Sequence, residues 1–307
     1  MTGAWKVPRV RLGALMADVT ASVIIITHNE GEMLGRTVDS VLASLPAGGE
    51  IVVVDDLSED GSTMGLEERD PRLRLLRPAE RLGAARARNA GADAAKGDVL
   101  VFSDAHVLVP AGWLEPLARA LAQPGVAAVG PVISSLEEPE KKGYGFQWVD
   151  AALTVSWLPR QGETPYAVPM LGAGFLAARA DVFRSLGGFD AGMIVWGVED
   201  GELCLRLWSM GHECRLVPEV EVQHLFRSTH PYPVGWVPVL HNTLRTAAVH
   251  FDRARTEKVI SAAVTKQAFP EALARLLESD VLDRRAEVRR RRKRDDGWFF
   301  ERFPAGW

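Results

Sequence analysis

Three short apolar runs, each followed by polar residues, constrain the fold of this chain most strongly. They are SVIIIT (22–27), EIVVVD (50–55) and DVLVFS (98–103), and they are rich in β-branched residues, which favour strands. Between them, residues 33–45 place apolar side chains on one helical face, and residues 84–97 predict an alanine-rich helix ended by glycine. Strands that alternate with helices at this spacing predict an α/β fold, in which helices flank a mostly parallel central sheet.

The rest of the chain continues this pattern and then changes. RLRLL (72–76) predicts a weaker strand, and residues 112–131 predict a helix followed by a strand, VAAVGP. ECRLVP (213–218) and VEVQHLF (220–226) predict two further strands. Residues 240–285 are rich in helical patterns, so we expect a helical C-terminal extension.

Composition limits the class of protein. The chain has 307 residues, of which 47% are hydrophobic and 25% charged, as expected for a globular protein with a large core. Its formal net charge of -4 gives no overall attraction to nucleic acid. No apolar run reaches bilayer length, and the first residues lack the core of a signal peptide. Cys204 and Cys214 lie in core-like stretches, so we expect reduced thiols and a soluble cytoplasmic protein without a transmembrane segment.

Polar side chains follow the predicted strands at the points where the strands end. Asp55 and Asp56 end one strand, and Asp104 and His106 follow another. Aspartate is common in turns, which is the simpler interpretation. Ligands of α/β sheets, however, bind beyond the carboxyl ends of the strands, and four polar groups at such ends favour a binding site.

Two of these residues predict a metal site. In an extended segment residues i and i+2 point to the same side, so Asp104 and His106 can bind one ion together. A carboxylate and an imidazole suit a divalent metal such as manganese. His224 is a third candidate, because it shares a face of its predicted strand with Val220 and Val222. Three protein ligands would leave positions for substrate oxygens, for example those of a diphosphate.

Other motifs narrow the chemistry. The GxGxxG fingerprint is absent after the first strand, as is a Walker loop, which counts against a nicotinamide dehydrogenase. Arg81, Arg86 and Arg88 could assist a diphosphate or simply form the polar face of a helix. Trp196 could stack on a sugar ring while the acids at 199–200 hold its hydroxyls, although acids at a helix start also stabilise the helix dipole.

Taken together, these segments resemble GT-A fold glycosyltransferases of family 2 and, more closely, the catalytic domain of the polypeptide N-acetylgalactosaminyltransferases. The resemblance covers about residues 20–235 and rests on several independent motifs. In order, the matching segments are SVIIITHNE, TVDSVL, EIVVVDDLS, LGAARARNAGADAAKGDVLVFSDAH, GWLEPL, GFLAARADVFRSLGGFDAGMIVWGVEDGELCLRLWSMG, VEVQHLFR and PYP.

This resemblance implies a domain plan. A Rossmann-like GT-A catalytic domain would span residues 21–238, with a nucleotide-binding half at 21–131 and a sugar and acceptor half at 132–238. Residues 1–20 would form an N-terminal extension. Residues 239–307 would form the helical extension, which contains a basic run at 289–294 and an aromatic tail. The basic run could be a solvated helix end or a patch for an anionic partner, and the tail could pack on the body or on an acceptor.

The resemblance also implies an activity and a site. The enzyme would move a sugar, of the hexose or N-acetylhexosamine type such as GalNAc or GlcNAc, from a UDP-sugar to a hydroxyl or thiol of a peptide, natural product or glycan. Mn²⁺ (or Mg²⁺) would be bound by Asp104, His106 and His224. The UDP-sugar would be bound by Thr27, Asn29, Glu30, Asp55, Asp56, Arg86, Ser103, Asp104, Gly172, Ala173, Gly174, Trp196 and Glu199.

One departure from the family pattern bears on mechanism. Where the polypeptide transferases usually read Trp-Gly-Gly-Glu-Asn, this chain has Val198 and Asp200 at the third and fifth positions. Those transferases retain anomeric configuration, whereas inverting family-2 enzymes commonly use the aspartate of a similar Glu-Asp pair as a base. Asp200, with Glu199 beside it, is therefore the candidate catalytic residue. If Asp200 is the base the anomeric carbon is inverted, as we expect here; if it is not, stabilisation of the leaving group dominates and retention stays open.

Two other classes of protein remain open. A sugar-nucleotide nucleotidyltransferase also binds nucleotide and metal on a parallel sheet, but its usual basic, glycine-rich loop is missing here, where THNEGEML (27–34) is acidic. A non-catalytic protein that binds sugar nucleotides or glycans on the same fold would keep the pocket and lose the metal ligands or the base, and this chain has candidates for both.

Overall fold

The fold is described from a computed structural model, which covers residues 20–227 and 235–307. Its elements, in chain order, are β1 (Ala21–Thr27), α1 (Glu32–Leu42), β2 (Glu50–Asp55), β3 (Leu73–Leu76), α2 (Ala84–Ala94), β4 (Val99–Asp104), β5 (Val107–Leu108), α3 (Leu114–Leu121), β6 (Val126–Ser135), β7 (Lys142–Gly143), β8 (Phe146–Trp148), β9 (Val155–Trp157), β10 (Tyr166–Ala167), β11 (Phe175–Arg179), α4 (Ala180–Ser185), α5 (Glu199–Ser209), β12 (Glu213–His224), α6 (Trp236–His250), α7 (Arg253–Ala263), α8 (Phe269–Leu277), α9 (Val281–Arg291) and α10 (Asp296–Arg302).

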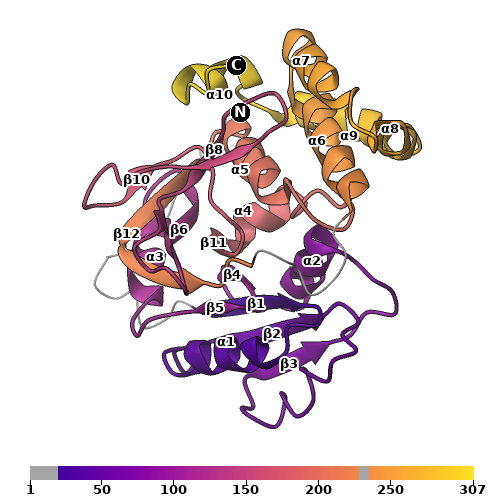
Figure 1. Cartoon of the computed structure of the whole chain (residues 1–307). Coiled ribbons are helices and arrows are strands. Elements are labelled where there is room, and N and C mark those ends of the chain that lie inside the picture. The colour runs from indigo at the N-terminus through magenta and orange to yellow at the C-terminus, as the bar shows by residue number, and fades with distance from the viewer. Residues whose placement is uncertain (1–19, 228–234) are drawn as a thin grey trace, which may run out of the picture.

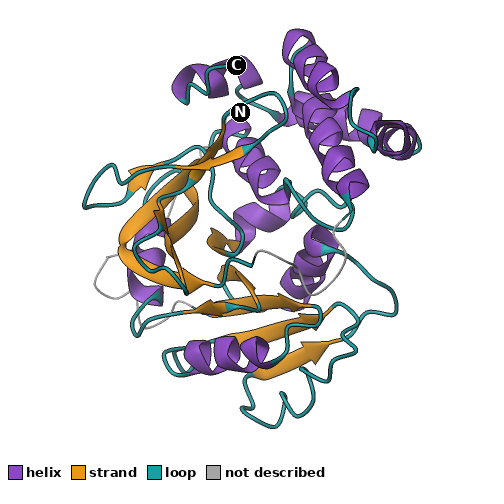
Figure 2. Cartoon of the chain, in the orientation of Figure 1, coloured by secondary structure: helices purple, strands orange, loops and turns teal. Residues whose placement is uncertain are grey.

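A mixed central sheet organises these elements. Its strand order is β10-β12-β6-β11-β4-β1-β2-β3, and helices lie on both sides of it (Figure 2). The strands β4, β1, β2 and β3 are all parallel, as expected from the sequence. Strand β11 runs antiparallel between β4 and β6, which the sequence pattern did not indicate. The fold is thus α/β with a mostly parallel sheet and a helical C-terminal region, as predicted.

The alternation of side chains along the strands explains the two helical layers. Val23 and Ile25 of β1 face α1, where Leu34 and Val38 are buried against them. Ile24 lies between Val23 and Ile25, and its side chain points to the opposite face of the sheet, toward the alanines of α2. Figure 1 shows α1 and α2 on opposite sides of the strands β1 to β3. Burial on both faces is why these strands are continuous apolar runs.

The two predicted strands after residue 212 form one strand in the structure. Strand β12 pairs with β6 along its whole length, but its register shifts between Val217 and Glu221. Pro218 lies in this irregularity. Proline cannot donate a ladder hydrogen bond and is tolerated at a bulge, so the strand bends there and continues to His224.

The helices α6 to α10 gather at one end of the molecule, above α5 (Figure 1). The aromatic tail packs on the body: Trp298 and Phe303 contact Trp208 of α5, and Phe300 contacts Phe251. Of the predicted N-terminal extension, residues 1–19 lie outside the described residues, as does the PYP segment. Within the described residues, no helix is long and apolar enough to cross a membrane.

Two side chains of the basic run, those of Arg291 and Arg292, bind main-chain carbonyls. Arg291 donates to the carbonyl of Ser185, at the end of α4, with a separation of 2.6 Å. Arg292 donates to the carbonyl of His250, at the end of α6. Helix C-termini carry partial negative charge, so these cations are favourable there. Part of the basic run is therefore structural.

Candidate active site

A cleft of about 300 Å³ opens beyond the carboxyl ends of β1 and β4. Parallel neighbours of a sheet end at the same edge, which is why residues far apart in the sequence meet there. Among the residues predicted for the site, those that line the cleft are Thr27, Glu30, Asp56, Asp104, His106, Gly172, Gly174, Trp196, Glu199, Asp200 and His224. The predicted residues outside this lining are Asn29, Asp55, Arg86, Ser103 and Ala173.

Asp104, His106 and His224 come together in the cleft. Each offers a ligand atom, and these atoms lie within 4.8 Å of one another. Strand pairing causes this: His224 pairs with Val107 of β5, and the main-chain N–H of Leu225 donates to the carbonyl of His106. One carboxylate oxygen and two imidazole nitrogens are a donor set that suits Mn²⁺. The residues present therefore fit a divalent ion.

The backbone beside these three residues is crowded. A Cβ at Gly174 would lie 3.2 Å from Oδ2 of Asp104 and 3.2 to 3.3 Å from the His224 ring. Glycine at this position therefore lets the chain pass close to the candidate ligands.

The carboxyl group of Asp104 is ionised. Burial works to raise its pKa, but the hydrogen bond from His224 and the charges of Arg88 and His106 outweigh burial, so this pKa lies well below its ordinary value. Asp104 is thus ionised, as a metal ligand must be.

Glu30 contacts the ring nitrogen of His106 that is not assigned to the metal. Its Oε2 lies 3.0 Å from Nδ1 of His106 and 2.7 Å from Nη1 of Arg227. This contact engages Nδ1 and leaves Nε2 of His106 to bind an ion. Burial works to lower the pKa of His106, but the hydrogen bond to Glu30 and the charge of Asp104 together raise it. Glu30, which was predicted to contact the UDP-sugar, is thus placed to orient a candidate metal ligand.

Arg88, and not Arg86, is the arginine of α2 that faces the cleft. Arg88 is buried and lies within 2.8 Å of Asp104 and 2.9 Å of Glu199. Arg86 is exposed and pairs with Glu80. A signal for Arg88 was present in the sequence, since it lies three residues after Ala85 and four after Ala84, on the buried alanine face of the helix.

Asp55, the last residue of β2, and Asp56, which follows it, have different surroundings. Asp56 lines the cleft and accepts hydrogen bonds from the main-chain N–H groups of Leu82 and Gly83, at 2.6 and 3.0 Å. Asp55 is buried and accepts from the N–H of Ser58 and the hydroxyl of Thr63. Asp56 is therefore placed to contact a ligand in the cleft, while Asp55 stabilises the loop that follows β2.

The acidic pair Glu199 and Asp200 opens α5, and both residues also line the cleft. Glu199 accepts from the N–H of Gly197 and pairs with Arg88. Asp200 accepts from the N–H groups of Ala173 and Gly201. Burial, with the charge of Glu199, raises the pKa of Asp200 to about 7. A carboxylate with such a pKa can exchange a proton near neutral pH.

Three further predicted residues have clear positions. Thr27 presents a buried Oγ1 that has no hydrogen-bond partner among residues 20–227 and 235–307, which is a polar atom available to a ligand. Asn29 binds the N–H of Glu59. Ser103 is buried, and its hydroxyl donates to the carbonyl of Asp104. The latter two stabilise the strand ends that carry the cleft.

One wall of the cleft is aromatic, and its residues were not predicted from the sequence. Trp157 and Phe226 both line it, with ring centroids 6.1 Å apart, and each ring is partly exposed. Trp157 comes from a stretch with no readable periodicity, so its sequence position gave no signal. An exposed aromatic surface beside candidate metal ligands suits contact with a ring or an apolar side chain of a ligand.

Comparison with protein families gives two matches. The family described as glycosyl transferase family 2 matches residues 22–187. A second family, described as the N-terminal domain of galactosyltransferase, matches residues 160–231.

Among curated proteins, this chain is similar to polypeptide N-acetylgalactosaminyltransferases. Polypeptide N-acetylgalactosaminyltransferase 16 of Mus musculus is 35% identical over 261 residues, which is 77% of this chain and 46% of that protein. Polypeptide N-acetylgalactosaminyltransferase 11 of Xenopus tropicalis is 35% identical over 258 residues, covering 76% of this chain and 43% of that protein. The chain thus spans less than half the length of these relatives.

Two solved glycosyltransferase structures have a fold similar to that of this chain. A crystal structure of GalNAc-T7 with UDP, GalNAc and Mn²⁺ aligns with a TM-score of 0.77 and 26% identity, covering 92% of this chain and 56% of that one. A mannosyltransferase from Pyrobaculum calidifontis in complex with GDP-Man and Mn²⁺ aligns with a TM-score of 0.54 and 22% identity, covering 87% of this chain and 73% of that one. The second similarity bears on the fold alone.

Proposed function

This chain belongs to glycosyl transferase family 2, and from that premise we propose that it transfers a sugar from a UDP-sugar to an acceptor in a metal-dependent reaction. The observation that carries the proposal is the meeting of Asp104, His106 and His224 in a cleft at the carboxyl edge of the sheet. The GalNAc-T7 structure, which contains UDP, GalNAc and Mn²⁺, supports uridine as the nucleoside of the donor and an N-acetylhexosamine as its sugar.

Asp104, His106 and His224 would hold the ion, and Glu30 would orient His106. A divalent ion bound there would neutralise the negative charge that grows on the diphosphate as it leaves. Arg88 holds Asp104 and Glu199 in place from inside the protein. Thr27, at the end of β1, and Asp56, just after β2, would contact the uracil and the ribose.

Asp200 is proposed as the general base. Its carboxylate would take the proton from the acceptor hydroxyl while the acceptor oxygen bonds to the anomeric carbon and the bond from that carbon to the diphosphate breaks. UDP then leaves, and the anomeric configuration is inverted. A pKa of about 7 lets Asp200 accept the proton near neutral pH and release it afterwards. If Asp200 does not take this role, stabilisation of the leaving group dominates and retention of the anomeric configuration stays open.

The acceptor is proposed to be a peptide, natural product or glycan that presents a hydroxyl. The polypeptide transferases named above support a peptide. Trp157, Phe226 and Trp196 line the cleft and would contact the apolar parts of the acceptor or of the sugar.

A thermal-shift screen tests the donor assignment. UDP-, GDP- and dTDP-sugars are each added with and without Mn²⁺, because a ligand that binds only the folded protein raises the melting temperature. We expect the largest rise with a UDP-sugar and Mn²⁺ together. Stabilisation by a GDP- or dTDP-sugar alone would refute the uridine assignment.

A further inference from the structure

We propose that Asn242 and Arg245 of α6 are positioning residues that hold residues 190–198, called here the Trp196 segment, in its reactive shape. This segment joins the core to α5 and carries Trp196, while Glu199 follows it directly. Both of these residues line the cleft. The inference rests on the proposed function, because it assigns a role in sugar transfer to side chains that lie outside the cleft lining.

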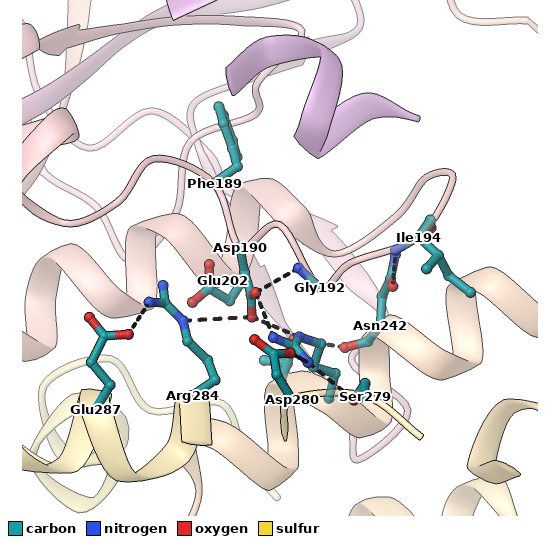
Figure 3. Close-up of polar contacts among 12 residues, drawn as sticks. Phe189, Asp190, Gly192, Ile194, Glu202, Asn242, Ser279, Asp280, Arg284 and Glu287 are labelled. Atoms are coloured by element: carbon teal, nitrogen blue, oxygen red, sulfur yellow. Dashed lines mark hydrogen bonds and ion pairs between the residues drawn. The ribbon is translucent and has the colours of Figure 1, made fainter. Parts of the chain in front are cut away.

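Asn242 binds the main chain of the segment through both ends of its amide. Its Oδ1 accepts from the N–H of Ile194 at 2.9 Å, and its Nδ2 donates to the carbonyl of Ile194 at 3.0 Å. The same Nδ2 donates to the carbonyl of Gly197 at 2.9 Å and lies 3.4 Å from that of Trp196. Figure 3 shows Asn242 reaching Ile194 from α6. Asn242 is 1% exposed, so water cannot replace these bonds at low cost.

Arg245, one helical turn later, fixes the start of the segment. Its Nε and Nη2 bind the two carboxylate oxygens of Asp190, at 2.9 and 2.8 Å, and its Nη1 lies 2.8 Å from Asp280. The guanidinium is fully buried. A Cβ at Gly192 would collide with it, so the segment passes directly over Arg245. A planar, bidentate pair of this kind fixes direction as well as distance.

The backbone of the segment requires such anchoring. Val195 and Val198, on either side of Trp196 and Gly197, have φ angles of 53° and 72°. A β-branched residue rarely adopts this left-handed conformation, which persists only where the surroundings enforce it. On the α2 side, the N–H of Ala84 donates to the carbonyl of Val195 at 2.7 Å. Asn242 supplies the corresponding bonds on the α6 side, so the strained turn is held from two directions.

The expected consequence is specific to sugar transfer. Asp104, His106 and His224 come from β4, the β4–β5 connection and β12, and none of them depends on α6 for the contacts described above. The uracil and ribose are assigned to Thr27 and Asp56, so loss of the Asn242 amide should leave the affinity for UDP unchanged. The same loss should misplace Trp196 and Glu199 and lower kcat by roughly tenfold to a hundredfold, as small misplacements of reacting groups do.

Hydrogen–deuterium exchange of the free protein tests the anchoring without any substrate. Asn242→Ala removes all of these bonds. Asn242→Asp is the second variant: it keeps an acceptor for Ile194 and replaces the donor with an oxygen that faces the carbonyls of Ile194 and Gly197. Thr246→Val is the matched control, because Thr246 is equally buried on α6 and its hydroxyl binds only a helix carbonyl in the described structure. We expect faster exchange in peptides that cover 190–198 for both Asn242 variants and not for Thr246→Val.

The kinetic test uses the same variants with a UDP-sugar and Mn²⁺, and it measures kcat together with the dissociation constant of UDP. A fall in kcat with unchanged UDP affinity supports the proposal. Unchanged exchange at 190–198 in both Asn242 variants, or faster exchange with unchanged kcat, overturns it. If the wild-type protein processes no UDP-sugar, the proposed function fails and so does this role in transfer; the exchange result still decides whether Asn242 anchors the segment.

Discussion

Nη2 of Arg88 lies 2.8 Å from Oδ1 of Asp104, so a buried cation on α2 is paired with the carboxylate that we assign to the metal. The other terminal nitrogen of Arg88 lies 2.9 Å from Glu199, at the start of α5. One guanidinium thus joins a candidate metal ligand to the acidic pair. Only a planar cation with separate donors can serve both carboxylates at these distances.

Replacing Arg88 with Lys should lower both stability and metal affinity. A single ammonium cannot satisfy both carboxylates, and a buried charge left without its partner costs about 3–5 kcal/mol. Urea denaturation measures the stability, and titration with Mn²⁺ measures the affinity. The control is Arg86→Lys on the same helix, where an exposed pair with Glu80 is worth roughly 1 kcal/mol or less. Equal losses in the two variants would contradict the special position of Arg88.

Replacing Glu30 with Gln should weaken Mn²⁺ binding by about tenfold to a hundredfold, because removal of a carboxylate that orients a histidine ligand typically has that effect. Glu30 holds Nδ1 of His106 at 3.0 Å. Isothermal titration of Mn²⁺ measures the change. Glu32→Gln is the control, since Glu32 is exposed in the first turn of α1. If both variants bind Mn²⁺ like the wild type, Glu30 does not orient a ligand.

The rate of transfer should rise with pH and level off above pH 7. Burial and the charge of Glu199 raise the pKa of Asp200 to about 7, and only the ionised form can act as a base. A profile of kcat against pH checks this, and Asp200→Asn should remove both the activity and the inflection. NMR of the product determines its anomeric configuration. A retained centre would remove Asp200 from the role of base.

The same residue should affect stability in the opposite direction. Between its unfolded pKa of 3.8 and about 7, Asp200 holds a proton in the folded protein that it releases on unfolding. Its contribution to the free energy of unfolding therefore decreases as pH rises through this window. Asp200→Asn should melt at a higher temperature than the wild type above pH 7 and at a similar temperature below pH 4. Calorimetry across this range measures the difference, and a lower melting temperature of the variant above pH 7 would contradict the raised pKa.

The aromatic tail should contribute strongly to stability. Phe299 is 2% exposed and contacts Phe300 and Phe303, so Phe299→Ala should cost about 3 kcal/mol or more through the cavity it leaves. Leu282→Ala, at a position 75% exposed on α9, should change stability by less than about 0.5 kcal/mol. Chemical denaturation compares the two. A loss at Phe299 no larger than that at Leu282 would show that the tail packs weakly.

Strands and helices were predicted well from the sequence where their buried side chains follow a regular pattern along the chain. EIVVVD (50–55) matches β2 residue for residue, because a strand buried on both faces is apolar throughout. The antiparallel direction of β11 was not predicted, since strand direction depends on a chain reversal that leaves no periodic signal. The division of β12 into two strands was wrong for a related reason: Pro218 is typical of a strand end, and the structure accommodates it in an irregularity instead.

Within the candidate site, the residues at strand ends could be predicted from the sequence, whereas those on helices could not be picked out in the same way. Residues at strand ends, such as Asp104 and His106, carry a position-specific signal, because parallel strands finish at one edge. Arg88 lies two residues after the exposed Arg86 and so on the opposite face of α2, and the buried Ala84 and Ala85 were the signal that could have distinguished the two. Asn242 acts on a segment some fifty residues earlier in the chain, and no local pattern connects the two.

The most direct test of the proposed function is the release of UDP from UDP-GalNAc and UDP-GlcNAc by the wild-type protein and by Asp104→Ala. We predict release with Mn²⁺ that stops when the ion is chelated and that is lost in Asp104→Ala, while the folded state of the variant is checked by its melting curve. Release of UDP at the wild-type rate by a folded Asp104→Ala protein would contradict the assignment of the metal site.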